Sequence, residues 1–126
     1  MPVEPDQQQL SALAALAAEG GDGPVVMLNL NRYRDRSEYE RYGEVALAVL
    51  ARLGGKVLWH TQAKQTVIGD DSDQWDEVIA VQYPNAAAFM AFAADPEIVA
   101  ALPHRTAALE RAALICCEPG SSEISL

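Results

Sequence analysis

The stretch GPVVMLNLNRY, residues 23–33, decides the fold. Its apolar run over residues 25–30 is interrupted only by the amide Asn29, and Asn31 and Arg32 follow. This composition predicts a β-strand with two amides set into it. Side chains alternate between the two faces of a strand, and here both parities are apolar. The pattern therefore predicts a strand that is covered on both faces.

Composition and charge limit the class of protein. The chain has 126 residues, of which 50% are hydrophobic and 21% charged, as expected for one globular domain. A net charge of −9 and nine scattered Lys and Arg residues argue against nucleic-acid and anionic-membrane partners. The first residues, MPVEPDQQQ, lack the features of a signal peptide, and no apolar run has the length of a membrane span. We expect a cytoplasmic protein.

The first 22 residues predict a helical extension to a single domain over residues 23–126. Leucines in the segment 6–19 recur at helical spacing, and Asp6 can serve as its N-cap. The glycines and the proline of GGDGP, residues 20–24, predict the end of this helix.

Helices and strands are expected to alternate after residue 33. Ser37 and Glu40 form a capping-box pattern that predicts the start of a helix, and Gly54 and Gly55 predict its end. Two strands are expected to follow and to pair as a long hairpin, over residues 56–61 (with a possible extension over 64–69) and 75–83, around the turn 70–74.

The C-terminal third predicts two short helices and a last strand. Asn85 can cap a helix over residues 86–94, and Asp95 with Pro96 can begin another that Pro103 ends. Residues 104–110 could be helical again, and the apolar segment 112–117 predicts the final strand.

This order of elements predicts an α+β fold of the ferredoxin-like β-α-β-β-α-β type, with a four-stranded antiparallel sheet. The strands over residues 78–81 and 114–117 are also apolar at both parities. Helices cover one face of such a sheet, so we expect a second copy of the sheet to cover the other in a two-fold homodimer.

The chain resembles the dimeric α+β barrel superfamily and, within it, a bacterial family of domains of unknown function. The resemblance covers roughly residues 24–118. It rests on Leu28 with Asn29, on Tyr39, Tyr42 and Gly43, on GGKVLW at 54–59, on VIG at 67–69, on WDEVIAVQYPNAAAF at 75–89, on DPE at 95–97 and on Arg105 with Ala107 and Ala108. It implies a homodimer with a cavity in or beside the sheet-to-sheet interface. It implies no single chemistry, because the superfamily includes cofactor-independent mono-oxygenases, isomerases and cyclases, haem-handling enzymes and ligand-binding regulators.

The two amides of the first strand are the first candidates for ligand binding. Asn29 and Asn31 share a parity with Met27, and the other parity (Val26, Leu28, Leu30) is more uniformly apolar. We expect the apolar parity to face the helices and the asparagines to face the inter-sheet cavity. A buried amide must be hydrogen-bonded, so each asparagine either satisfies its neighbours or is presented to a ligand.

Four further residues are candidates for the site. Trp59 and His60 point to opposite faces of one strand, so only one of them can line the cavity, and histidine suits acid–base work near neutral pH. Tyr42 could direct its hydroxyl toward a pocket opening, although a core role is the simpler reading. Arg105 could bind a carboxylate or an enolate, or pair with Glu97 or Glu110 on the surface.

Two acids open the strand at 75–83. Asp76 or Glu77 could act as a base where an apolar wall raises its pKa, and simple solvation is the alternative. The catalytic candidates are thus His60, Asp76 and Arg105.

Metal and nucleophile motifs are absent from the sequence. The two histidines have no ligand spacing, and residues 70–73, DDSD, do not match a calcium loop, so we expect no metal and no cofactor. A haem on His60 or His104 rests on the superfamily analogy alone. Adjacent Cys116 and Cys117 would make a strained disulfide, and we expect them to be reduced core residues.

Two functions follow. The first is a homodimer that binds a small molecule without turnover, and the second is a cofactor-independent enzyme for a small apolar or aromatic carbonyl or phenolic compound.

Overall fold

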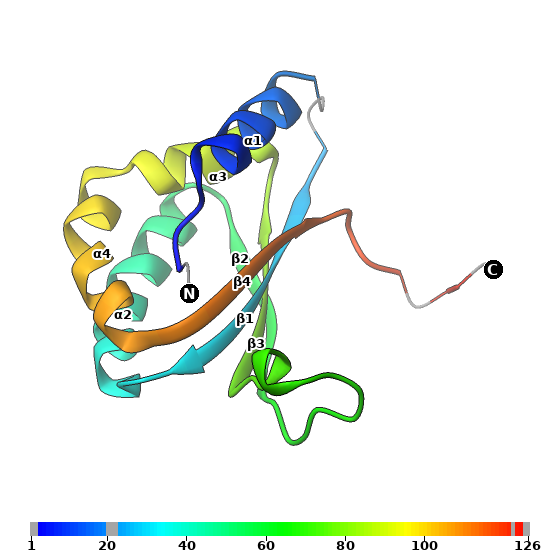
Figure 1. The fold of residues 1–126 in the computed structure, drawn as a ribbon. Helices are drawn as coiled ribbons and strands as arrows, with labels where there is room; N and C mark the ends of the chain where they lie inside the picture. Colours follow the sequence, from blue (N-terminus) through cyan, green and yellow to red (C-terminus); the bar gives the residue numbers. More distant parts are fainter. Residues whose placement is uncertain (1–2, 20–22, 122, 125–126) are drawn as a thin grey trace.

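The computed structural model describes residues 3–19, 23–121 and 123–124. A four-stranded antiparallel sheet in the order β2-β3-β1-β4 carries its α-helices on one face (Figure 1). The strands are β1 (Val25–Tyr33), β2 (Lys56–Gln62), β3 (Glu77–Tyr83) and β4 (Leu109–Cys117). The α+β class and the ferredoxin-like topology expected from the sequence are confirmed.

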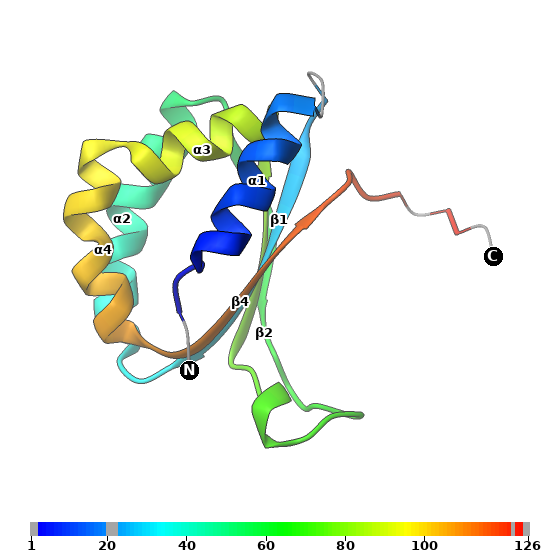
Figure 2. The ribbon, with the colours of Figure 1, turned by 45° about the horizontal axis from the view of Figure 1, so that its top comes forward.

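The helical layer contains α1 (Gln7–Glu19), α2 (Arg36–Arg52), α3 (Ala86–Ala94) and α4 (Pro96–Ala108). Helix α2 packs beside α4, and α1 lies beside α3 (Figure 2). The short helix η1 (Asp71–Asp73) belongs to the long β2–β3 connection, which projects beyond the sheet in Figure 1. The core lies between helices and sheet, around Met27, Val49, Leu50 and Ile98.

Most helix starts follow the predicted capping chemistry. Asp6 accepts a hydrogen bond from the backbone of Gln9 at 2.8 Å, and Asn85 accepts one from Ala88 at 2.7 Å. Asp95 caps α4, with Pro96 in its first turn. Helix α2 differs, because its N-cap is Asp35, which accepts from the backbone of Ser37 at 3.1 Å, so the expected start at Ser37 is wrong. The part of the predicted helix end at residues 20–22 lies outside the described residues.

Proline 103 does not end a helix. Helix α4 runs through it to Ala108, and β4 begins at the next residue. The packing of Ile98, Ala101 and Ala108 against the core compensates for the hydrogen bond that a proline removes.

The faces of β1 are opposite to our expectation. Met27 belongs to the core under the helices, so the alternation of side chains places Asn29 and Asn31 on that face too. Val26, Leu28 and Leu30 face away from the helices. Because the strand is apolar at both parities, its pattern could not decide which face the helices cover.

The cysteines are unpaired, as expected, but they are not core residues. Cys116 is exposed and Cys117 is half-buried. Both lie at the end of β4, an edge strand with a neighbour on only one side, and this position explains their exposure.

Candidate functional site

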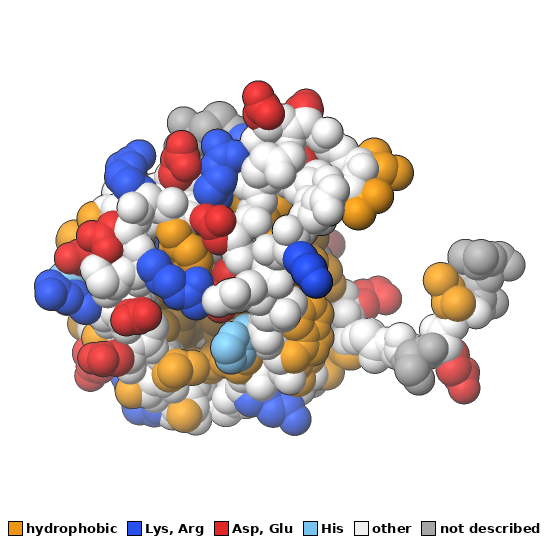
Figure 3. All heavy atoms as spheres, turned by 90° about the horizontal axis from the view of Figure 1, so that it is seen from below, with side chains coloured by type: hydrophobic (Ala, Val, Ile, Leu, Met, Phe, Trp, Pro, Cys, Tyr) orange, Lys and Arg blue, Asp and Glu red, His pale blue; other side chains and the backbone are white. Residues whose placement is uncertain are grey.

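A cavity of about 1070 Å³ lies between the helices and the sheet. Its floor comes from the helix-facing side chains of the strands, including Met27, Asn29 and Val81, and its roof from α2, α3 and α4. Leu10, Leu13 and Leu16 of α1 complete one wall. Seen from below, hydrophobic side chains line a hollow that charged side chains surround (Figure 3). The described cavity is thus within one chain and not between two sheets.

Small residues in the helices leave this space open. Gly43 lies in α2 at the cavity wall, and a Cβ added there would meet nothing within 4 Å. Ala46, one turn further along α2, also lines the cavity. Side chains of this size cannot fill the distance between a helix and a sheet.

A buried polar cluster closes one end of the cavity. Glu77 opens β3 opposite Asn31 of β1, and the two residues are 5% and 1% exposed. The Tyr33 hydroxyl donates to Oε1 of Glu77 and accepts from Nδ2 of Asn31 at 3.4 Å. Arg36 Nη2 donates to Oε2 of Glu77 at 3.3 Å. The cluster therefore satisfies a carboxylate that is withdrawn from water.

Asn29 and Asn31 have different roles in this arrangement. Asn31 is held inside the polar cluster. Asn29 lines the cavity, and its Nδ2 donates to the carbonyl oxygens of Met27 at 3.2 Å and Ile79 at 3.3 Å. These bonds leave the Oδ1 atom of Asn29 as an acceptor for a ligand.

The ambiguity between Trp59 and His60 is resolved in favour of His60. The register of β2 with β3 shifts between Val57 and Trp59, and this bulge brings both Val57 and His60 to the helix-facing side. His60 lies at the cavity rim, with its Nδ1 atom 3.5 Å from Oε2 of Glu77. Trp59 lies on the opposite face and is 51% exposed, so it does not line the cavity.

Arg105 reaches the cavity from α4. Its Nη1 atom donates to the carbonyl oxygen of Val3 at 2.6 Å. The surface pairs expected for it do not form, because Glu110 pairs with Arg32 at 3.2 Å and Glu97 lies 4.0 Å from Arg52. Within the described part of the chain, no acidic side chain pairs with Arg105.

Burial raises the pKa values of the tyrosines that line the cavity. Burial raises the pKa of Tyr42 to about 12, although the positive charge of Arg105 opposes this shift. Burial also raises the pKa of Tyr39, against the effects of an Asn31 hydrogen bond and of Arg105, while Glu77 adds to the rise. The charges of Arg105 and Glu77 therefore both act on Tyr39.

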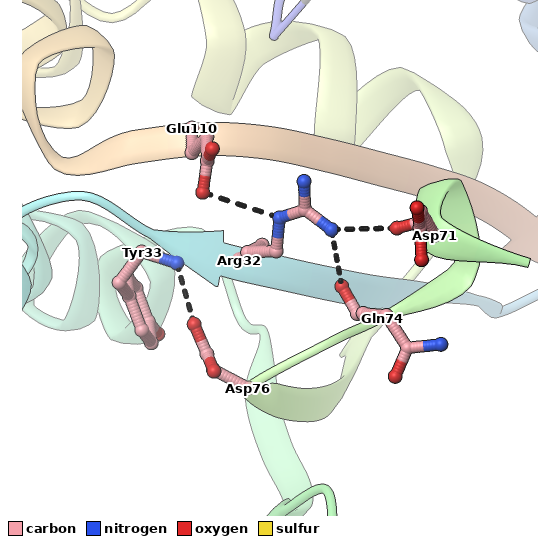
Figure 4. Close-up of polar contacts among 6 residues, drawn as sticks. All are labelled: Arg32, Tyr33, Asp71, Gln74, Asp76 and Glu110. Atoms are coloured by element: carbon pink, nitrogen blue, oxygen red, sulfur yellow. Dashed lines mark hydrogen bonds and ion pairs between the residues drawn. The ribbon is translucent and has the colours of Figure 1, made fainter. Parts of the chain in front are cut away.

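Asp76 has a structural position outside the cavity. Its Oδ2 atom accepts a hydrogen bond from the backbone of Tyr33 at 2.8 Å (Figure 4). Beside it, Arg32 joins Glu110 of β4 to the carbonyl oxygens of Asp71 and Gln74 in the β2–β3 connection. These contacts link β1, β4 and the segment that leads into β3, and Asp76 does not line the cavity.

The second histidine is also separate from the cavity. His104 lies on α4 with its Nδ1 atom 2.6 Å from Oε2 of Glu38 on α2. Among the described residues, no group of three His, Cys, Asp or Glu side chains could hold a metal ion.

The centre of the polar cluster is not among the residues that the sequence pattern singles out. Tyr33 and Arg36 were not candidates, and Glu77 was named only as an alternative to Asp76. A signal was present, because Glu77 shares its strand parity with Ile79, Val81 and Tyr83, all of which line the cavity. An acid at the covered parity of a strand requires partners, so it marks a polar cluster.

In the described part of the chain, no single helix has the length and apolarity to cross a membrane. Only α3 and α4 taken together, bent by 77°, meet that test.

Comparisons with known proteins agree on the fold. The family model described as "Domain of unknown function (DUF1330)" matches residues 25–118. The crystal structure of RPA0582, a protein of unknown function from Rhodopseudomonas palustris, is similar over 94% of this chain and 97% of its own, with 33% identity and a TM-score of 0.86. No curated protein matches the chain.

Two more distant structures show the fold alone. A dabb family protein with a ferredoxin-like fold from Mesorhizobium loti shares 19% identity, with a TM-score of 0.54, over 79% of this chain and 99% of its own. Hydroxynitrile lyase from Passiflora edulis shares 11% identity, with a TM-score of 0.60, over 82% of this chain and 99% of its own.

Proposed function

Because the chain belongs to the family described as a domain of unknown function (DUF1330), whose description assigns no ligand, we propose a function from the residues of its cavity. The protein binds a small, mainly apolar carboxylic acid between its helices and its sheet. The observation that carries this proposal is Arg105, a cation at a largely apolar cavity with no acidic partner among the described residues.

Different parts of the cavity suit the two ends of such a ligand, Arg105 its carboxylate and the apolar wall the remainder of the molecule. A guanidinium group binds carboxylates well, and a partly dehydrated site strengthens that interaction. Met27, Val57, Phe89 and Phe92 offer an apolar surface to the remainder of the molecule. Asn29 offers a hydrogen-bond acceptor on the floor, which supports binding of a ligand that carries a hydroxyl or amino group.

Calorimetric titration with 3-phenylpropanoate tests the proposal. Arg105→Gln removes the charge, and we expect it to weaken binding about tenfold or more, as for a lost charged hydrogen bond. Gly43→Leu fills the cavity from α2, where the structure has free space, and should abolish binding. Arg41→Gln changes an exposed arginine of α2 and serves as the control.

Two results would contradict the proposal. Absence of binding to the unaltered protein would exclude this class of ligand. Equal binding by the Gly43→Leu variant would place the ligand elsewhere, for example on the uncovered face of the sheet.

We propose further that the protein is a homodimer joined through that face. Helices cover one face of the sheet, and the other carries Leu58, Trp59 and Ile115, which are 41%, 51% and 48% exposed. A second copy offers a surface of the same apolar chemistry, and resemblance to the dimeric α+β barrel superfamily supports this partner. Sedimentation at micromolar concentration should give twice the 13.6 kDa of one chain, and a single species of 13.6 kDa would overturn the dimer.

The cytoplasmic location stays a prediction, which cell fractionation would test. The second candidate function, a cofactor-independent enzyme, is favoured by one observation, the contact between His60 and Glu77 at the cavity rim.

A further inference from the structure

A histidine and a fixed carboxylate meet where the cavity opens to solvent. Nδ1 of His60 lies 3.5 Å from Oε2 of Glu77, and both residues line the cavity. The His60 side chain is 67% exposed, whereas that of Glu77 is 7% exposed. The pair thus has one accessible member, His60, and one buried member, Glu77.

The surroundings of Glu77 hold its carboxylate in place. Tyr33 donates to one oxygen, and Arg36 donates to the other at 3.3 Å. Glu77 therefore presents a fixed negative charge to the Nδ1 side of the imidazole. A charge in this position stabilises the imidazolium that forms when Nε2 takes up a proton, and it orients the ring.

The other imidazole nitrogen is available to a ligand. Among the described residues, Nε2 of His60 has no hydrogen-bond partner. Arg105 completes the arrangement, because it lines the same cavity as His60 and Glu77 and supplies a cation for the carboxylate of a ligand.

We propose that this cavity catalyses the keto–enol tautomerisation of an apolar 2-oxo acid, with His60 as the catalytic base and Glu77 as its positioning residue. The proposal rests on the proposed binding of a carboxylic acid. Arg105 would bind the carboxylate, and the apolar wall would hold the side chain of the acid. The proposal places C3, the acidic carbon next to the keto group, beside His60, which lines the same cavity.

The proposed step needs no oxidant, reductant or cofactor. Nε2 of His60 removes a proton from C3, and the electron pair of the C3–H bond forms the C2–C3 double bond. The π electrons of the C2 carbonyl move to its oxygen, which then takes the proton back from Nε2. The products are the enol and neutral His60, so atoms and charge balance.

Exchange of the C3 protons of phenylpyruvate for deuterium, followed by proton NMR, tests this activity. We expect the unaltered protein to accelerate the exchange over buffer, and His60→Ala to lower that rate about 100-fold or more, the usual weight of a general base. Because His60 is exposed at the rim, added imidazole should restore part of the rate in this variant. His104→Ala, which changes the only other histidine, should retain the full rate.

Glu77→Gln separates a positioning role from a structural one. It should lower kcat with little change in KM, whereas loss of the fold would also remove binding of 3-phenylpropanoate. Calorimetry with that non-reactive acid distinguishes the two proposals. Binding without faster exchange, or undiminished exchange by His60→Ala, would overturn the tautomerase alone, and absence of binding would overturn the proposed function together with it.

Discussion

The hydroxyl group of Tyr33 donates a hydrogen bond to the carboxylate of Glu77 between the two central strands of the sheet. Asn31 donates to the same hydroxyl oxygen, and Arg36 to the other carboxylate oxygen. A buried carboxylate is costly unless its oxygens accept hydrogen bonds. The Tyr33 hydroxyl therefore stabilises the sheet by satisfying a buried carboxylate that also lines the cavity.

Replacement of Tyr33 by phenylalanine should expose this link. The change keeps the ring but leaves one oxygen of Glu77 without its donor, which should lower the free energy of unfolding by about 1–3 kcal/mol. Urea unfolding followed by circular dichroism measures the loss. Tyr83→Phe is the control, because Tyr83 is buried and its hydroxyl makes no hydrogen bond with a described residue. Equal losses in the two variants would contradict this role for the Tyr33–Glu77 bond.

Alkaline pH should unfold the protein through its tyrosines. The chain has four, and burial raises the pKa of each of them, that of Tyr42 to about 12. Because the pKa in the folded state lies above the unfolded value of 10.0, the folded state keeps its tyrosine protons at a pH where the unfolded state has lost them. This difference lowers the free energy of unfolding as pH rises from 10 toward 12. The tyrosines should thus not lower the free energy of unfolding below about pH 10, and they should lower it between about pH 10 and pH 12.

Tyrosinate absorbance gives the measurement. At about pH 10.5, where most unperturbed tyrosine side chains are ionised, the folded protein should show much less tyrosinate than the same chain in concentrated urea. Equal absorbance with and without urea, while circular dichroism still reports a folded protein, would contradict the buried positions of the rings.

Gly55 is required by the close approach of α2 and β3. A Cβ at this position would collide with Leu50 Cδ1 and lie 3.0 Å from the carbonyl oxygen of Gln82. Gly55→Ala should therefore cost about 1–3 kcal/mol of stability, as overpacking usually does. Gly43→Ala is the matched control, since a helical glycine with free space around it should gain about 0.5–1 kcal/mol. Urea unfolding should move in opposite directions for the two variants.

The elements whose signals are local could be predicted from the sequence. Asn85 and Asp95 cap helices because a short polar side chain reaches the backbone two or three residues ahead, and neighbouring residues alone decide this. The predicted start of α2 was wrong because Asp35 and Ser37 both offer such a side chain, and in the structure Asp35 is the N-cap.

The geometry of the site could not be predicted in the same way, because it depends on contacts between residues that lie far apart in the sequence. The pattern of β1 alone makes Asn29 and Asn31 candidates, but the face on which they lie depends on which side of the sheet the helices cover. His60 reaches the cavity through a bulge that no residue of β2 marks. Glu77 acquires its partners from the register of β3 with β1, which pairs it with Asn31. Register is a property of two strands, and the sequence of one strand does not contain it.

A charge at position 59 should separate the proposed dimer without touching the cavity. Trp59 lies on the uncovered face of the sheet, where a partner would bury it. A carboxylate in its place would be buried without a counter-ion in the dimer, at a cost of several kcal/mol. We expect Trp59→Glu to sediment as a monomer that keeps its circular dichroism. Val99→Glu on α4, a position with the same 51% exposure, should leave the dimer intact, and a dimeric Trp59→Glu variant would argue against this interface.

Replacement of Pro103 by alanine should stabilise the protein. Pro103 lies inside α4 and has no N–H to donate to the carbonyl group of Val99, and a proline inside a helix costs up to about 3 kcal/mol. Pro103→Ala should therefore raise the free energy of unfolding, by about 1–3 kcal/mol where the helix accepts the new hydrogen bond. Pro96→Ala is the control, because a proline in the first helical turn leaves no carbonyl without its donor. If the two variants gain equally, the missing hydrogen bond is not what limits α4, and the packing of Ile98 and Ala101 sets the path of this helix instead.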